Sequence, residues 1–101
     1  MLKKKYRLPA EVRFKSPTSQ SFKSFILKTK ENAFSYPRFA FVISKSVDKR
    51  AVVRNKIKRE MTTAVSSLLE KAGGKDYIFI LKRSATENLG NLEKEIKEIL
   101  Q

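Results

Sequence analysis

Two short apolar segments, separated by a long amphipathic one, most strongly limit the folds open to this chain. Residues 38–44 (RFAFVIS) are apolar at both alternating sets of positions, which predicts a strand buried on two sides or central in a sheet. Residues 76–82 (DYIFILK) repeat the pattern, so we expect a second interior strand beside the first. Between them, a helix from about Lys49 to Ala72 should end at Gly73-Gly74, because glycine readily adopts the positive φ favoured at a helix end.

The flanking segments complete the predicted element order. Pro9 suits the first turn of a short helix that continues to about Lys15, and residues 16–19 read as a turn. Residues 22–30 alternate between apolar and wetter positions, which predicts a strand, and residues 31–37 read as a loop. The apolar positions of the last segment recur at helical spacing: Leu89, Leu92, Ile96, Ile99 and Leu100.

These elements give the order α-β-β-α-β-α. We therefore expect an α+β fold in which a small sheet and its helices form a two-layer α/β sandwich. At 101 residues the chain should form one domain, 1–101, because two separate cores would each be too small to be stable. Residues 1–7 read as a basic tail, which either gains order on RNA or only aids solubility.

The charge of the chain is strongly positive and unevenly distributed. Lys and Arg number 23 against 10 Asp and Glu, a net charge of +13. Residues 1–83 carry 21 basic and six acidic residues (+15), whereas residues 84–101 carry two and four (−2). This excess indicates a polyanionic partner, with nucleic acid favoured over an anionic membrane. The chain has no apolar run of membrane-spanning length and no signal-peptide core, so we expect it in the cytoplasm.

The residue types of most hydrolytic and metal sites are missing. The sequence has no Cys and no His, which removes disulfides, the usual zinc ligands and the commonest general base. The carboxylates are scattered without a recognisable pair, and no phosphate-binding loop is present. We therefore expect no catalytic residue, no metal ligand and no cofactor bound by the protein itself.

The beginning of the central helix carries an unusual cluster of cations. At 100° per residue, an apolar stripe of core residues is predicted: Val53, Ile57, Met61, Ala64, Val65, Leu68 and Leu69. Arg54 and Lys58 lie on this arc or at its edge, while Asn55, Lys56 and Arg59 project from the other side, and Lys45, Lys49 and Arg50 precede them. Only Asp48 and Glu60 offset this charge locally, and Asp48 reads as a helix N-cap or turn residue.

Folding alone would not favour this placement. Cations at a helix N-terminus oppose the helix dipole and repel one another. A phosphate backbone reverses the sign, because the free N–H groups, the dipole and the cations then attract the same anions. The alternative is a solvated charged face whose Lys and Arg stems cover apolar surface.

The segment at the beginning of the predicted central helix resembles a motif of a known family. Residues 51–59 (AVVRNKIKR), entered from an apolar strand through Ser44-Lys45, are similar to the basic helix motif of the bacterial ribonuclease P protein, Arg-Asn-Arg-x-Lys-Arg. Arg54, Asn55, Lys58 and Arg59 match this motif, and Lys56 replaces an Arg. Residues 75–82 also look like the strand that follows in that family, and the similarity extends over about residues 7–100.

The resemblance implies a role beside a catalytic RNA. In that family the RNA subunit removes the 5′ leader of precursor tRNA, and the protein binds both this RNA and the leader. The residues expected at the RNA subunit are Lys45, Lys49, Arg50, Arg54, Asn55, Lys56, Lys58 and Arg59. Magnesium would bind through the RNA. The family fold, that of ribosomal protein S5 domain 2, implies a left-handed βαβ crossover, against the usual right-handed preference.

The same resemblance implies a leader cleft between the first helix and the sheet. A single strand suits aromatic faces for stacking and cations for its phosphates, which makes Arg13, Phe14, Lys15, Phe25 and Lys28 the candidates. A core position for Phe14 is an equal alternative. Phe22 and Phe25 have opposite parity on a strand, so only one of them can face a cleft.

Other functions remain open at this stage. A small RNA-binding protein of the ribosomal-protein kind, without a role in cleavage, is the main alternative. A lipid-surface protein and a stand-alone nuclease are further ones. Lys82-Arg83 either extends the basic surface or simply ends a strand.

Overall fold

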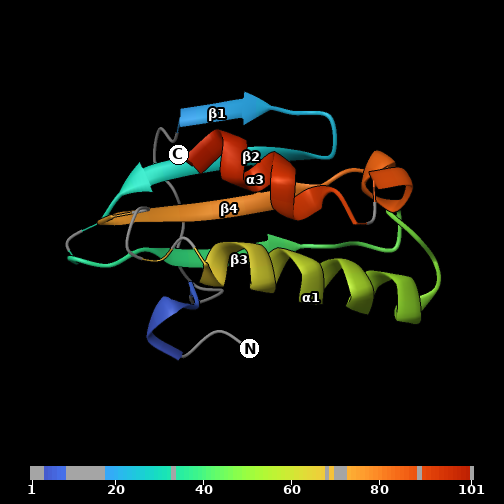
Figure 1. Ribbon diagram of the computed structural model, residues 1–101, viewed down its shortest axis with the longest axis horizontal. Helices are drawn as coiled ribbons and strands as arrows, with labels where there is room; N and C mark the ends of the chain where they lie inside the picture. The colour runs from blue at the N-terminus through green and yellow to red at the C-terminus, as the bar shows by residue number, and fades with distance from the viewer. Residues whose placement is uncertain are drawn as a thin grey trace.

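A computed structural model describes residues 4–8, 18–32, 34–67, 69, 73–88 and 90–100. The described elements are η1 (Lys4–Tyr6), β1 (Thr18–Ser21), β2 (Phe25–Glu31), β3 (Arg38–Val42), α1 (Ala51–Ser66), β4 (Lys75–Leu81), η2 (Arg83–Asn88) and α3 (Leu92–Leu100). The fold is mixed α/β, and one four-stranded sheet carries α1 and α3 on the same face (Figure 1). The first predicted helix, about 9–15, lies outside the described residues.

The strand order in the sheet is β1-β2-β4-β3. β1 and β2 pair antiparallel, β2 and β4 pair antiparallel, and β3 and β4 pair parallel. In Figure 1, β3 and β4 run from left to right, α1 returns in front of the sheet, and β4 lies above β3. This is the left-handed sense of crossover that the family resemblance implied.

The core lies between the sheet and the two helices. Phe25 and Leu27 of β2 and Tyr77, Phe79 and Leu81 of β4 alternate with residues on the opposite face of the sheet, and all five are buried. The helices contribute the buried residues Ile57, Met61, Ala64 and Val65 from α1, and Leu92 and Ile96 from α3. This burial confirms the described part of the apolar stripe predicted for the central helix.

Three predictions about the strands are wrong. Residues 18–21 form the edge strand β1, although a turn was predicted for residues 16–19. These four residues are all exposed and polar, and they form a strand because they pair with Ile26–Thr29. Phe22 lies outside β2, in a turn closed by a hydrogen bond from its N–H to the Phe25 carbonyl (2.8 Å). β3 is an edge strand and not an interior one, and its outer side is covered locally where Leu8 N–H donates to the Phe39 carbonyl (2.8 Å).

The central helix is shorter than predicted. α1 begins at Ala51, and its described continuous part ends at Ser66. Gly73 has φ of 63°, which confirms the positive φ expected there. The N-cap of α1 is Arg50, and no side chain caps the helix, so Asp48 belongs to the preceding turn.

Glu60 joins α1 to the C-terminal helix. Its carboxylate Oε1 accepts hydrogen bonds from the backbone N–H groups of Gly90 (2.8 Å) and Leu92 (3.1 Å). Leu92 is the first residue of α3, so the helix cannot satisfy its N–H internally, and Gly90 lies in the turn just before it. Glu60 therefore holds the start of α3 in place and does not neutralise the cations of α1.

We predict that Glu60→Ala lowers the free energy of unfolding by about 1–2 kcal/mol, because two backbone donors lose a charged acceptor. Glu60→Gln keeps one acceptor oxygen at the same position and should lose less. Urea unfolding followed by circular dichroism measures both variants. Equal stability of Glu60→Ala and the parent protein would contradict this role.

Candidate nucleic-acid interface

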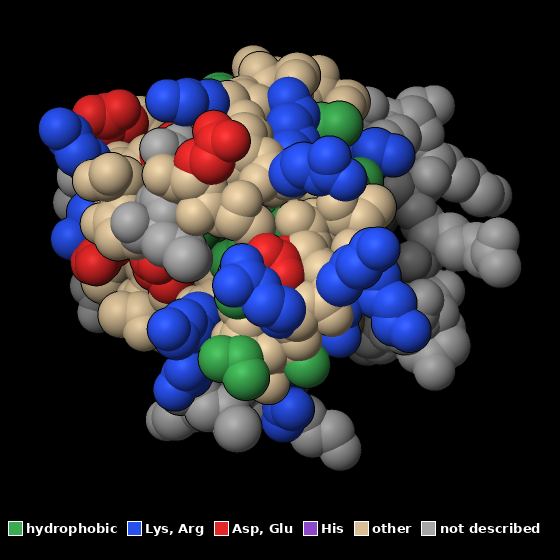
Figure 2. All heavy atoms as spheres, turned by 90° about the vertical axis from the view of Figure 1, so that its right-hand side faces the viewer, with side chains coloured by type: hydrophobic (Ala, Val, Ile, Leu, Met, Phe, Trp, Pro, Cys, Tyr) green, Lys and Arg blue, Asp and Glu red, His purple; other side chains and the backbone are tan. Residues whose placement is uncertain are grey.

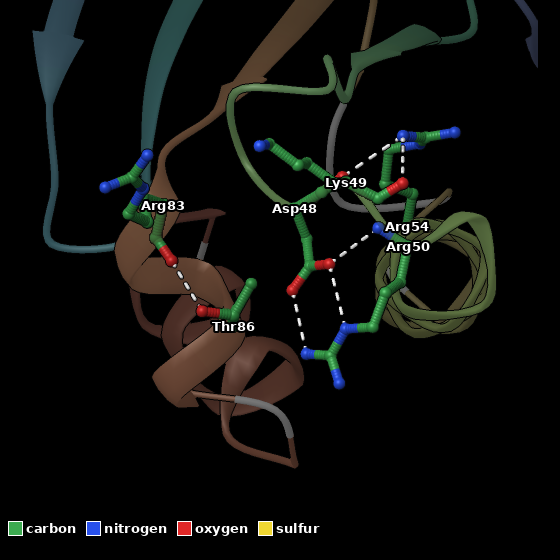
Figure 3. Close-up of polar contacts among 6 residues, drawn as sticks. All are labelled: Asp48, Lys49, Arg50, Arg54, Arg83 and Thr86. Carbon is green, nitrogen blue, oxygen red and sulfur yellow. Dashed lines mark hydrogen bonds and ion pairs between the residues drawn. The ribbon is translucent and has the colours of Figure 1, made fainter.

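The turn before α1 presents the predicted cations from a fixed backbone. The Asp48 Oδ1 atom accepts a hydrogen bond from the Arg50 backbone N–H (2.8 Å), and the Asp48 carboxylate also accepts hydrogen bonds from the Arg50 guanidinium through Nε (3.1 Å) and Nη2 (3.0 Å). Figure 3 shows the two side chains lying against each other. The hydrogen bonds from Arg50 lower the pKa of Asp48 to about 2, so this carboxylate is ionised at neutral pH.

Arg54 connects the helix to this turn. Its Nη1 atom donates to the backbone carbonyls of Asp48 (3.1 Å) and Lys49 (3.3 Å). Arg54 is half-buried, whereas Lys49 and Arg50 are exposed. The Arg54 guanidinium, which was predicted to contact RNA, is therefore partly occupied by hydrogen bonds within the protein. These bonds fix the backbone that carries Lys49 and Arg50.

The remaining predicted cations are open to a ligand. Lys45, Lys49, Lys56, Lys58 and Arg59 are all exposed, and none forms an ion pair with another residue in the described part of the chain. The two carboxylates that could have offset them locally are occupied, Asp48 by Arg50 and Glu60 by the backbone of α3. A surplus of positive charge thus remains at the beginning of α1.

Three of the predicted residues share a groove along the exposed side of α1. The groove has a volume of about 750 Å³ and is lined by Val52, Asn55, Lys58, Arg59, Thr62 and Thr63. Val52 is 65% exposed, which is unusual for a large apolar residue. Figure 2 looks at the end of the molecule where α1 begins, and Lys and Arg side chains gather there around exposed hydrophobic atoms.

Arg83 is a further exposed cation, on η2 at the same end of the molecule as this turn (Figure 3). The sequence left open whether Lys82-Arg83 extends the basic surface. In the structure the two residues have different surroundings. Lys82 Nζ donates to Ser21 Oγ (2.6 Å) and to the Phe22 carbonyl (2.7 Å), so Lys82 ties the β1–β2 turn to the end of β4. The sequence predicted the strand but not η2, which directly follows it, so it could not indicate where Arg83 would lie.

The face of the sheet opposite α1 and α3 carries the second group of candidates. Lys28 alternates with the buried Phe25 and Leu27 of β2, so it lies on that opposite face, beside Ile78 of β4. We call this side of the sheet the open face. The prediction that Lys28 lies on the more solvent-exposed side of its strand is confirmed. Arg13, Phe14 and Lys15 lie outside the described residues.

Phe25 is a core residue. It is fully buried, and its ring lies 5.1 Å from that of Phe79 in an edge-to-face contact. Phe22 packs against the same core from the turn, 5.5 Å from Phe25. Neither ring therefore lies on the open face, and the prediction of Phe25 as a leader-binding residue is corrected, because the strand begins at Phe25 with its first side chain toward the helices.

Neither a metal-binding cluster nor a membrane-spanning helix occurs among the described residues. These residues contain no group of three or more Asp or Glu residues that could hold a metal ion. Within the same ranges, no helix has the length and apolar character needed to cross a membrane. The exposed cations of α1 and the open face are thus the features suited to a ligand.

Known proteins with similar sequences point to one family. Residues 2–101 match the family described as Ribonuclease P. The chain is 50% identical over 52 residues to the ribonuclease P protein component of Nostoc punctiforme, a match that covers 50% of this chain and 37% of that protein. It is 42% identical over 65 residues to that of Microcystis aeruginosa, covering 62% and 54%. The matches thus span about a third to a half of the length of these curated relatives.

Solved structures share the fold. An RNase P protein variant of Staphylococcus aureus, described as defective in mRNA degradation activity, superposes with a TM-score of 0.86 at 25% identity, covering 96% of this chain and 86% of that one. The RNase P protein of Thermotoga maritima superposes with a TM-score of 0.75 at 19% identity, covering 84% and 82%. The fold of this chain is therefore that of the bacterial RNase P proteins.

Asp48→Asn should strengthen binding to a polyanion such as single-stranded RNA. Asn keeps the acceptor for the Arg50 N–H but loses the charge that holds the guanidinium, so Arg50 gains freedom to meet a phosphate. Fluorescence anisotropy at several salt concentrations should show the slope of log K against log salt becoming steeper by about 0.7–0.9.

This gain should not depend on pH between about 5 and 8, since a carboxyl with a pKa of about 2 stays ionised throughout that range. Its charge would be lost only as the pH falls through about 2. Unchanged affinity of Asp48→Asn would mean that Arg50 does not reach the bound RNA.

Proposed function

The chain belongs to the ribonuclease P family, and on that premise we propose that it is the protein subunit of a ribonucleoprotein that removes the 5′ leader of precursor tRNA. The observation that carries the proposal is the set of exposed, unpaired cations at the beginning of α1, in the segment that matches the family's basic motif. Their arrangement suits the phosphate backbone of an RNA subunit. The cytoplasm is the expected compartment.

The basic helix would bind the RNA subunit. Lys58 and Arg59 reach phosphates from the groove on α1, and Asn55 supplies a donor and an acceptor that can fix the register on a sugar or base edge. Lys49 and Arg50 extend this contact across the turn that Arg54 holds. Lys45 and Lys56, both exposed, add long-range attraction at its margins.

The open face would bind the leader. Lys28 contributes a cation in the middle of β2, beside the half-buried apolar side chains of Ile26 and Ile78. Arg13, Phe14 and Lys15 remain predicted members of this cleft. A surface of this kind recognises a single strand through its phosphates and base faces, with little dependence on sequence.

The chemical step would belong to the RNA. The described residues hold no group of three or more carboxylates that could bind a metal ion, and magnesium would be bound by phosphate oxygens of the RNA. The protein's contribution is to neutralise phosphates and to position the leader. A loss of repulsion between RNA segments lowers the concentration of magnesium that the RNA needs.

Reconstitution tests the proposal. Adding the protein to a bacterial ribonuclease P RNA should lower the magnesium concentration required for cleavage of a precursor tRNA at its mature 5′ end. The measurement is the initial rate of leader release across a magnesium series, with and without protein.

Protein without the RNA subunit serves as the control, and it should release no leader. No gain over the RNA alone would favour a different RNA-binding role, such as that of a ribosomal protein. Cleavage by the protein alone would favour a nuclease. Preference for anionic vesicles over RNA at equal salt would favour a lipid-surface protein.

Lys58→Ala should weaken binding to the RNA subunit and flatten its salt dependence by about one phosphate contact, a change of roughly 0.9 in the slope. The matched control is Lys94→Ala, which removes an equally exposed cation from α3 and should leave the slope unchanged. Equal slopes for Lys58→Ala and Lys94→Ala would remove this helix from the interface.

Arg54→Ala should also lower thermal stability, because it releases the turn at Asp48 and Lys49.

A further inference from the structure

A second cluster of aromatic rings and cations lies away from the basic helix, where β2 and β3 are joined. The rings of Phe34 and Tyr36 are stacked, with centroids 5.2 Å apart and planes inclined by 26°. Tyr36 in turn meets Tyr6 of η1 edge to face at 5.8 Å. Phe34 is 44% exposed, so this row of rings ends on one that is open to solvent.

The backbone at Phe34 and Tyr36 is tied to the side chain of Asn32. The Asn32 side chain accepts a hydrogen bond from the Phe34 backbone N–H (2.8 Å) and donates to the Tyr36 carbonyl (3.2 Å) and to Asp76 Oδ1 (2.9 Å). A Cβ atom at Gly74 would collide with the Phe34 carbonyl oxygen, so only glycine allows this close approach. A ring that is ordered before binding loses little entropy when a ligand stacks on it.

Cations surround these rings. The Arg38 guanidinium lies 4.7 Å from the centroid of Phe34 and is anchored by a 2.7 Å ion pair with the buried Asp76. Lys5 Nζ lies 4.9 Å and 5.1 Å from the centroids of Tyr6 and Tyr36. Because Arg38 and Asp76 are paired, together they add no net charge here, and the unpaired positive charge beside the rings is that of Lys5.

A polar hollow lies next to this loop. It has a volume of about 370 Å³ and is lined by Thr18, Thr29, Lys30, Glu31 and Lys75. Lys30 and Lys75 are exposed cations, and Glu31 is the exposed carboxylate among the lining residues. The surroundings of the ring thus carry more positive than negative charge, which suits a phosphate chain.

The cluster continues the open face of the sheet. Strand register places Lys28, Ile78 and Ala40 in one row on that face. Lys30, Asp76 and Arg38 form the next row, about 7 Å further along the strands. Arg38 packs against Phe34, so the exposed ring lies just beyond the second row, at the end of the face.

We infer that Phe34 stacks on an unpaired base of the 5′ leader, at a point that the strand reaches after crossing the open face past Lys28 and Arg38. The inference rests on the proposed function, because it takes the leader to be the strand on that face. Lys5 and Lys30 attract the neighbouring phosphates. Stacking on a phenyl ring accepts any base, so this contact recognises that the leader is single-stranded and long enough to reach it.

The test uses the holoenzyme assembled from the full chain and a ribonuclease P RNA. Precursor tRNAs with a short and a long leader are compared, and Phe34→Ala should weaken binding of the long-leader substrate by about fivefold or more. Binding of the short-leader substrate should not change. 2-Aminopurine placed in turn at each leader position should be quenched at one distal position by the parent holoenzyme.

Two conservative variants separate stacking from simple packing. Phe34→Tyr keeps the aromatic face and should retain both the affinity and the quenching. Phe34→Leu keeps the apolar side chain that covers the loop but has no aromatic face, so it should behave as Phe34→Ala. Urea unfolding of each variant checks that the loop change leaves the fold intact.

Leader affinity that is the same for Phe34→Leu and the parent protein would overturn the inference, as would quenching at no leader position. In either case a lower magnesium requirement with the RNA subunit would leave the proposed function standing. Failure of that magnesium effect in the parent protein would instead overturn the proposed function, and the inference with it.

Discussion

The burial of one side of α1 against the sheet is the constraint from which the exposed surfaces of this protein follow. Ile57, Met61 and Val65 are fully buried in the core that the helices share with the sheet, so the helix cannot rotate about its axis. Its opposite side must then face solvent along its whole length. The cations at its beginning are held there by the packing of residues that carry no charge.

The protein accepts an electrostatic cost at this helix and limits it locally. No acidic residue occurs in the first turn of α1 and no side chain caps it, although the helix dipole favours negative charge there. Asp48 pairs with one arginine, and Arg54 reaches back to two carbonyls, which stabilises the turn but leaves most of the charge exposed. In the described chain, an internal carboxylate pairs with one cation of this cluster, Arg50. A bound polyanion would neutralise the others.

Residue periodicity was sufficient to predict an element where its side-chain pattern is compatible with only one type of secondary structure. It located β3, β4 and the beginning of α1 to within about two residues, and the match to the basic motif located the cations that the structure leaves unpaired. It failed for β1, because four polar residues become a strand only through pairing with β2, a long-range contact with no local signal. Phe25 could not be assigned to one face, since the turn at Phe22 decides where the strand starts. The Phe34 cluster was missed because it depends on Asn32 and Gly74, which lie far apart in the sequence.

The sheet separates two surfaces that would bind different RNA segments. α1 packs on one side of β4, while Lys28 and the row ending at Arg38 lie on the other. Each surface alone offers exposed charges that salt screens and that bind weakly. Joined through the interior strand β4, they would hold their ligands at a fixed separation, so that binding of the first would raise the effective concentration of the second. On the proposed function, the protein would assist cleavage because it restricts where the leader lies relative to the RNA subunit.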